Sequence, residues 1–360
     1  SAAGATRSPQ LTPLGEVFAY NNAAIALAGR LIEVVTGSTY EEAVRELVLE
    51  PLGMSRSRFF SDESELADSL ASSNVAGPHN IVDGEPVLDN SLFDMPRQMR
   101  PSGGLFSSVR DLIQYATFHL SDGRAEDGTQ LLTNESLVAM RSNPGPGGTL
   151  ILELDGVGVT WELRPSAEGV PIVEKGGSWP GWYTGFTMVP ERGFAIIVLT
   201  NSNGGPRLQR DLIMDDWALR RFAGVSNTPA EPRALTDAEL APYEGLYIGR
   251  FMDDDGLRPL DADLKADNGQ LHMTLLKRPE SAAVPGDPED IAEPEELEPW
   301  VEQRLAFYHD DYVLVYDADS GEPKGTRADF IRDADGNLAW LRWGGRLFRH
   351  PGATGELPET

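Results

Sequence analysis

The chain has 360 residues, 40% of them hydrophobic, which is enough to form two globular domains. Its formal net charge of -27 argues strongly against nucleic acid as a partner, since phosphate contacts require a basic surface. The absence of cysteine excludes disulfides, thiolate metal sites and a cysteine nucleophile, and no apolar run is long enough to span a membrane.

The basic residues are almost all arginine. Only four are lysines, namely Lys175, Lys265, Lys277 and Lys324. Many carboxylates with few lysines are typical of proteins adapted to high salt, where screening removes the repulsion between like charges. An acidic surface that serves solubility alone has the same composition, so both interpretations stay open.

The first region predicts three helices, over residues 20–35, 38–50 and 108–120. The first is rich in alanine, has apolar residues at helical spacing, and stops at Gly37. The sequence Ser38-Thr39-Tyr40-Glu41 has the form of a capping box and begins the second, and a serine caps the third.

Strand patterns follow the third helix. Runs of alternating or β-branched residues predict strands over 156–163 and 171–175, and a hairpin formed by 181–189 and 193–201. A closing helix is predicted over 208–222. Helices packed on an antiparallel sheet give an α+β fold.

The pattern changes near residue 225, and the rest of the chain alternates short strands with turns. We predict a first domain over 1–224, a linker over 225–234 and a β-domain over 235–360, of the small barrel or sandwich type. An acidic, proline-rich insertion over 285–299 predicts a solvated flexible loop.

Two short motifs contain residue types that suit catalysis. The triplet Tyr20-Asn21-Asn22 stands at the start of the first helix, and alone it is a weak signal, since a tyrosine often packs at a helix start. The second motif comprises Lys175, Gly176, Gly177, Ser178 and Trp179. Its paired glycines allow a substrate to approach the backbone while the lysine faces an anion.

The second motif also has a plainer interpretation, a glycine-rich hairpin loop with an exposed lysine. That interpretation is less attractive because Lys175 is the only lysine among the first 264 residues.

The combination of motifs is more specific than either alone. With the stretches 16–54, PSGGLFSSVRDL (101–112) and EKGGSWPGWYTGF (174–186), the sequence resembles the penicillin-recognising serine hydrolases. These include class C β-lactamases, D-alanyl-D-alanine carboxypeptidases and family VIII esterases. The resemblance covers residues 11–224 in the expected order and implies a β-lactamase/transpeptidase-like fold. The part from about 235 resembles the lipocalin-like β-domain that some members append.

The resemblance implies a role for each motif residue. Tyr20 is expected to shuttle a proton between nucleophile and leaving group. Asn22 is expected to hydrogen-bond the substrate's amide or to orient a catalytic lysine. Lys175 is expected to hold positive potential and bind a carboxylate, and the Ser178 N–H to form half of an oxyanion hole. Trp179 either lines an acyl pocket or packs the hairpin.

The family's nucleophile belongs to a Ser-x-x-Lys motif, and no lysine here has a serine three positions before it. Thr274 precedes Lys277 at that spacing, but both fall on a predicted strand of the β-domain. We therefore expect as partner an N-terminal chain or segment that carries the serine. The favoured explanation is that this chain was cleaved from it near residues 1–10 and stays bound to it, and the second is that the N-terminal part is simply absent from this sequence. A natural pseudoenzyme is the third explanation and the least favoured.

The expected function is acyl transfer from an ester or amide to that serine, followed by hydrolysis, and this chain by itself is expected to be inactive. A peptide, an ester or a β-lactam fits, and the aromatic residues near Lys175 favour the first two. The resemblance implies no metal and no organic cofactor. The rival is a non-catalytic binding or regulatory protein. The compartment and the oligomeric state stay open.

Overall fold

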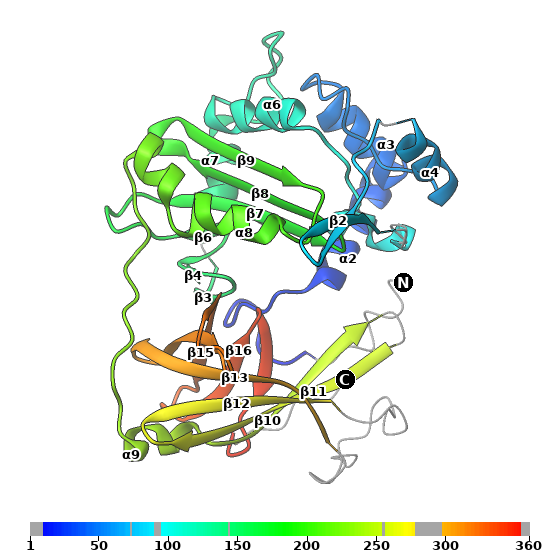
Figure 1. Cartoon of the computed structure of the whole chain (residues 1–360). Helices are drawn as coiled ribbons and strands as arrows, with labels where there is room; N and C mark the ends of the chain where they lie inside the picture. The colour runs from blue at the N-terminus through cyan, green and yellow to red at the C-terminus, as the bar shows by residue number, and fades with distance from the viewer. Residues whose placement is uncertain are drawn as a thin grey trace.

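The computed structural model describes residues 10–72, 74–89, 95–142, 145–253, 256–277 and 297–353. The predicted loop over 285–299 lies almost entirely outside these residues, as does the predicted cleavage region over 1–10. Figure 1 shows a region of helices and sheet above a barrel, joined by the connection over residues 224–236. None of the described helices is long and apolar enough to cross a membrane.

The first helices begin at side-chain caps. They are α2 (Asn22–Thr36), α3 (Tyr40–Val44) with the π-helical turn η1 (Arg45–Leu49), and α4 (Glu63–Ala71). Asn21 caps α2, and Gly37 ends it with a left-handed φ of 72°, as predicted. The capping box of α3 is Thr39 with Glu42. The predicted pair Ser38 and Glu41 was wrong by one residue, because Thr39 is the extended residue whose hydroxyl accepts the Glu42 N–H.

A second group of helices follows a short hairpin. The elements are β1 (His79–Val82), β2 (Glu85–Leu88), η2 (Arg97–Met99), α5 (Arg100–Gly103), α6 (Val109–Leu120) and α7 (Asn134–Ser142). Ser108 caps α6 by accepting the Asp111 N–H at 3.3 Å, which confirms the third predicted helix.

The centre of this region is an antiparallel sheet in the order β5-β6-β7-β8-β9. Its strands are β5 (Gly156–Val157), β6 (Glu162–Arg164), β7 (Ile172–Trp179), β8 (Trp182–Val189) and β9 (Phe194–Thr200). The predicted strand over 156–163 is in fact β5 and β6, because Thr160 has a φ of 64° and the chain reverses there. The hairpin of β8 and β9 is confirmed, with η3 (Pro190–Arg192) at its turn.

Helices cover both faces of the sheet. Leu112, Tyr115 and Ala116 of α6 pack with Val173 and Met188. The other face packs against α8 (Gly205–Gln209), η4 (Arg210–Met214) and η5 (Leu219–Ala223). The predicted closing helix over 208–222 is interrupted, because Asp216 has a left-handed φ of 51°.

The second region is a closed antiparallel barrel in the order β10 to β17. The strands are β10 (Gly245–Asp253), β11 (Gly256–Asp267), β12 (Gln270–Lys277), β13 (Glu298–His309), β14 (Tyr312–Asp317), β15 (Pro323–Arg332), β16 (Leu338–Trp343) and β17 (Arg346–Arg349). Pairing of β10 with β17 closes the barrel, and α9 (Asp237–Leu240) and η6 (Ala241–Tyr243) precede it.

The barrel interior is filled with side chains. Tyr247, Leu271, Met273, Phe307 and Phe348 are at most 2% exposed and belong to one apolar cluster. Buried residues alternate with more exposed ones along β12, β13 and β14, as in other small barrels whose side chains fill the interior. The predicted β-domain of barrel type is therefore confirmed.

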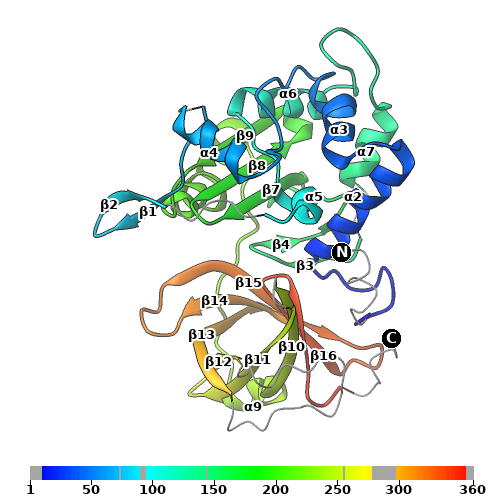
Figure 2. The ribbon, with the colours of Figure 1, turned by 90° about the vertical axis from the view of Figure 1, so that its right-hand side faces the viewer.

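The helices and sheet that precede residue 224 form the upper region, or sheet region. The barrel contacts this region through β3 (Gly148–Thr149), which pairs with β4 (Glu153–Leu154). Figure 2 shows β3 and β4 between the sheet above and β15 below. The buried Arg342 guanidinium bonds Asp329 at 2.6 Å, the Gly147 carbonyl at 3.0 Å and the Phe18 carbonyl at 2.6 Å. This arginine thus ties the barrel to two segments of the upper region.

Candidate active site

Tyr20 lies in a segment without regular secondary structure, two residues before α2. Its N–H donates to the carbonyl of Gly345 at 2.7 Å, and its own carbonyl accepts a hydrogen bond from Arg346. The next residue, Asn21, is the N-cap of α2 and accepts the Ala24 N–H at 3.2 Å. The helix cap and the barrel together fix the main chain on both sides of the tyrosine.

Lys175 reaches Tyr20 from the middle of strand β7. Its Nζ lies 5.3 Å from the centre of the Tyr20 ring, which is within cation–π distance. The same nitrogen lies 3.2 Å from Glu162 Oε1 on the neighbouring strand and donates to the Gly176 carbonyl at 2.8 Å. The structure therefore brings together the two residues predicted as catalytic, 155 positions apart in the sequence.

The charges around Lys175 favour its protonated form. Burial lowers the pKa of Lys175, but the attraction of Glu162 and of Tyr20 outweighs burial, so that its pKa is raised above the ordinary value. Burial raises the pKa of Glu162, and the Lys175 ammonium opposes that shift. Lys175 is thus a permanent cation beside the tyrosine at neutral pH.

The glycines of the second motif lie in a strand, whereas the sequence placed them at the end of one. Gly176, Gly177, Ser178 and Trp179 form the second half of β7 and pair with residues 182–185 of β8. A Cβ on Gly177 would lie 2.5 Å from Thr184 Oγ1, so a side chain there would require the threonine hydroxyl to move.

The residues predicted to bind substrate occupy an accessible surface. Asn22, Gly176, Gly177 and Ser178 are exposed, and Trp179 is half-buried. Asn22 is the first residue of α2. Their roles in binding, including the oxyanion-hole N–H of Ser178, stay predictions.

The aromatic residues at the β7–β8 turn have different surroundings. The Trp182 indole N–H donates to the Ala76 carbonyl at 2.9 Å, and its ring meets Phe106 edge-on at 5.8 Å. Trp182 therefore packs the β7–β8 hairpin against Ala76 and Phe106, which lie earlier in the chain. Trp179 pairs with Trp182 across the turn, and its place in an acyl pocket stays a prediction.

Sequence reasoning missed three residues of this site: Glu162, Gly345 and Arg346. Glu162 has a recognisable signal, a carboxylate inside an otherwise apolar strand pattern. Gly345 and Arg346 belong to the hairpin of β16 and β17, more than 320 positions from Tyr20 and inside an ordinary turn sequence. No local pattern marks such a distant contact.

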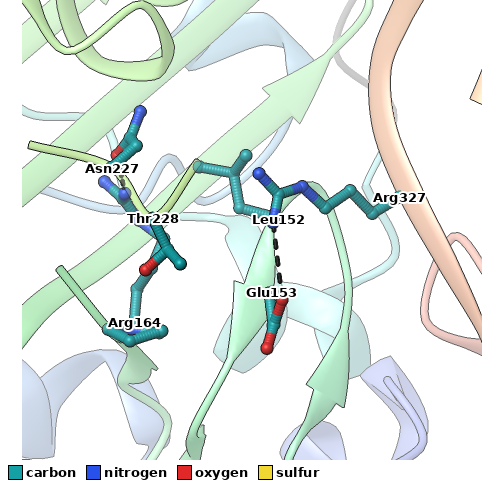
Figure 3. A pocket seen from close by; sticks show the side chains of 7 residues that line it. Leu152, Glu153, Arg164, Asn227, Thr228 and Arg327 are labelled. Carbon is teal, nitrogen blue, oxygen red and sulfur yellow. Dashed lines mark hydrogen bonds and ion pairs between the residues drawn. The ribbon is translucent and has the colours of Figure 1, made fainter. Parts of the chain in front are cut away.

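A separate small pocket lies at the junction of sheet, linker and barrel (Figure 3). Its lining consists of Leu152, Glu153, Arg164, Pro165, Asn227, Thr228 and Arg327, none of which is a predicted site residue. Arg327 lies 3.6 Å from Glu153, and Arg164 bonds Glu174 at 3.0 Å. The pocket's two arginines are thus paired with carboxylates, and the pair of Arg327 and Glu153 joins the barrel to the upper region.

Comparison with known proteins identifies a matching family, sequence relatives and solved structures of similar fold. A family described as Beta-lactamase matches residues 3–219. Penicillin-binding protein 4 of Amycolatopsis lactamdurans is 30% identical over 239 residues, which are 65% of this chain and 60% of that protein. Beta-lactamase-like protein 2 of Dictyostelium discoideum is 33% identical over 103 residues, 29% of this chain and 17% of that protein.

Among solved structures, the crystal structure of SurE superposes with a TM-score of 0.65 at 23% identity, covering 97% of this chain and 72% of that chain. At this identity the likeness shows the fold, and it includes both the upper region and the barrel. The chain spans 60% of the Amycolatopsis relative's length. Because the Beta-lactamase family matches more than half of the residues, this chain belongs to the beta-lactamase family.

Proposed function

We propose that this chain provides the tyrosine and lysine of a serine hydrolase that acts through an acyl-enzyme on an ester or amide. The observation that carries the proposal is the Tyr20 ring beside the Lys175 ammonium, at 5.3 Å, with Glu162 fixing the lysine. A positioned phenol is a group that can transfer protons, and the Lys175 ammonium supplies positive potential beside it. Membership of the beta-lactamase family supports the same reaction class.

In the proposed reaction, the serine's proton passes to the Tyr20 phenolate as the serine oxygen attacks the carbonyl carbon. The bond to the leaving alcohol or amine then breaks, and the leaving group takes that proton from Tyr20. Water next attacks the acyl-enzyme and gives a proton to Tyr20, which returns it to the serine as the acid leaves. The Ser178 N–H is the proposed oxyanion donor, Asn22 binds the acyl-side amide, and Lys175 binds a carboxylate.

The nucleophile in this proposal comes from a separate upstream chain or segment, because the sequence has no Ser-x-x-Lys. Exposed apolar side chains on the upper region support a covering segment. Leu31, Val34 and Val35 of α2 are 59%, 65% and 85% exposed, and Ile113 of α6 is 50% exposed. Strand β9 is also the outer strand of the described sheet and has β8 as its partner there.

Replacing Tyr20 with phenylalanine tests the reaction in a preparation that contains the upstream serine. We expect hydrolysis of a chromogenic ester to fall by about 100-fold or more, the usual contribution of a positioned acid–base group. Tyr316→Phe, on the barrel strand β14, is the matched control and should retain full activity. Activity that survives Tyr20→Phe would remove Tyr20 from the mechanism.

The missing Ser-x-x-Lys also favours a second candidate, a non-catalytic binding or regulatory protein. The filled barrel gives no support to ligand storage inside it, so binding would have to use the surface around Tyr20 and Lys175. Within the enzyme proposal, the tryptophans near Lys175 favour an ester or a peptide over a β-lactam. Turnover of each class by the same preparation, with Tyr20→Phe as the blank, distinguishes these substrates.

A further inference from the structure

We infer that the β16–β17 hairpin of the barrel is part of the candidate active site, where Gly345 and Arg346 position Tyr20. The inference rests on the proposed function, because it takes Tyr20 as the proton-transferring group. It assigns the barrel a role in the chemistry of the other region.

The hairpin uses both main-chain polar groups of Tyr20. The Gly345 carbonyl accepts the Tyr20 N–H at 2.7 Å, and the Arg346 guanidinium donates to the Tyr20 carbonyl. The same guanidinium lies 4.9 Å from the centre of the Tyr20 ring. Since Lys175 approaches that ring at 5.3 Å, two cations from different regions meet at one phenol.

Arg346 differs from Arg342 of the same hairpin. Arg342 has a carboxylate partner, Asp329, at 2.6 Å and ties the barrel to Phe18 and Gly147. Arg346 is half-buried, and among the described residues no carboxylate lies within ion-pair distance of it. Burying a cation without an anion costs free energy, and here the contacts with Tyr20 offset that cost. Both arginines thus join the two regions, Arg342 with an ion-pair partner within the barrel and Arg346 through its contacts with Tyr20.

Glycine is required at position 345 for the same contact. Gly345 has a φ of 72°, and a Cβ there would lie 2.8 Å from the Tyr20 Cβ and 2.6 Å from Leu150 Cδ1. Its neighbour Gly344 has a φ of 54°, but a Cβ there would meet open space. An alanine at either position would strain the backbone, because both have a positive φ. Only at position 345 would its Cβ also collide with Tyr20.

A proton-transferring group must hold its hydroxyl within hydrogen-bond reach of both the nucleophile and the leaving group. A shift of about 1 Å at such a group lowers the rate strongly. The segment before α2 has no regular secondary structure at Tyr20, so the barrel hairpin supplies the rigidity that a strand or helix would give.

The test is ¹⁹F NMR of the chain labelled with 3-fluorotyrosine, in which Tyr20→Phe identifies the Tyr20 signal among the nine tyrosines. We expect Gly345→Ala and Arg346→Ala to shift or broaden that signal, and Gly344→Ala and Arg346→Lys to leave it near its native position. The other tyrosine signals report whether each variant is folded. If Gly345→Ala does not fold, Arg346→Ala and its control Arg346→Lys test the inference. If Arg346→Ala does not fold, Gly345→Ala and its control Gly344→Ala test it.

Kinetics in a preparation with the upstream serine give the second readout. Arg346→Ala should lower kcat by about tenfold with little change in KM, and Arg346→Lys should recover most of it. An unmoved Tyr20 signal in folded Gly345→Ala and Arg346→Ala would overturn the inference. A moved signal in a preparation that never hydrolyses any ester or amide would support the positioning and contradict the proposed function instead.

Discussion

The barrel and the sheet region bury their apolar residues to very different extents. In the described part of the barrel, Trp300 is the one exposed large apolar side chain. The Lys277 Nζ lies over it, 4.3 Å from the centre of its ring. The sheet region exposes a row on α2 and further residues on α6 and η5, such as Phe222 at 59%. A closed barrel has no free edges and a filled interior, so it is complete by itself. The difference teaches that the exposed apolar surface of the described chain gathers on the sheet region, which is where the proposed covering segment would pack.

The largest predicted effect comes from breaking the link between the two regions. Arg342→Met leaves Asp329 buried without its partner, which should lower the free energy of unfolding by about 3–5 kcal/mol. Urea unfolding of the parent and the variant measures this loss of unfolding free energy. The double variant Arg342→Met with Asp329→Leu should recover much of the loss, because the lone buried charge is then gone. A single variant as stable as the parent would show that this pair does not join the regions.

A matched pair of leucines sharpens the comparison directly. Leu271 in the barrel is 0% exposed, and Leu31 on α2 is 59% exposed. Leu271→Ala should lower the free energy of unfolding by about 2–5 kcal/mol, and Leu31→Ala should change it by no more than about 0.5 kcal/mol. Both are read from urea unfolding of the chain. Equal losses would mean that the exposed face of α2 is already covered.

A smaller effect is expected from pH, through His119 in the sheet region. Burial lowers its pKa from 6.5 to about 4, with Arg141 contributing, so the unfolded chain binds a proton that the folded chain does not. Stability from His119 is present above pH 6.5 and is lost as pH falls toward 4. Between pH 7 and 5 this loss is about 2 kcal/mol.

His119→Phe should remove that part of the pH dependence, because phenylalanine suits the aromatic surroundings of Tyr115, Phe118 and Trp161. The measurement is the difference in unfolding free energy between pH 7 and pH 5 in parent and variant. An identical difference in both would show that His119 is not the buried neutral group.

Local sequence signals predicted most of the fold. Side-chain caps, the stop at Gly37 and strand alternation located α2, α3, α6, the β8–β9 hairpin and the barrel. The helices α4 and α7 and the β1–β2 hairpin were not predicted. The errors arose where one residue decides the outcome. Left-handed backbone at Thr160 and Asp216 split a predicted strand and a predicted helix. A β-branched threonine rarely adopts that conformation, and aspartate adopts it more often than most residues but still in a minority of positions.

The candidate site was predictable only in part. Tyr20 and Lys175 were found through their motifs and a family resemblance, and the structure places them together. Arg346 could not be found, because its contact with Tyr20 depends on how the barrel docks on the sheet region. Such docking is set by buried tertiary contacts, such as Thr149 with Asp329 at 2.6 Å, which leave no periodic pattern in the sequence.

The central claim is that a serine outside this sequence completes the site. Intact-mass spectrometry under denaturing conditions tests it on protein purified from its native source, with and without a fluorophosphonate probe. The account predicts that one probe mass is gained on a serine that peptide mapping places outside these 360 residues. A probe attached to a residue of this chain, or no labelling at all, would contradict it.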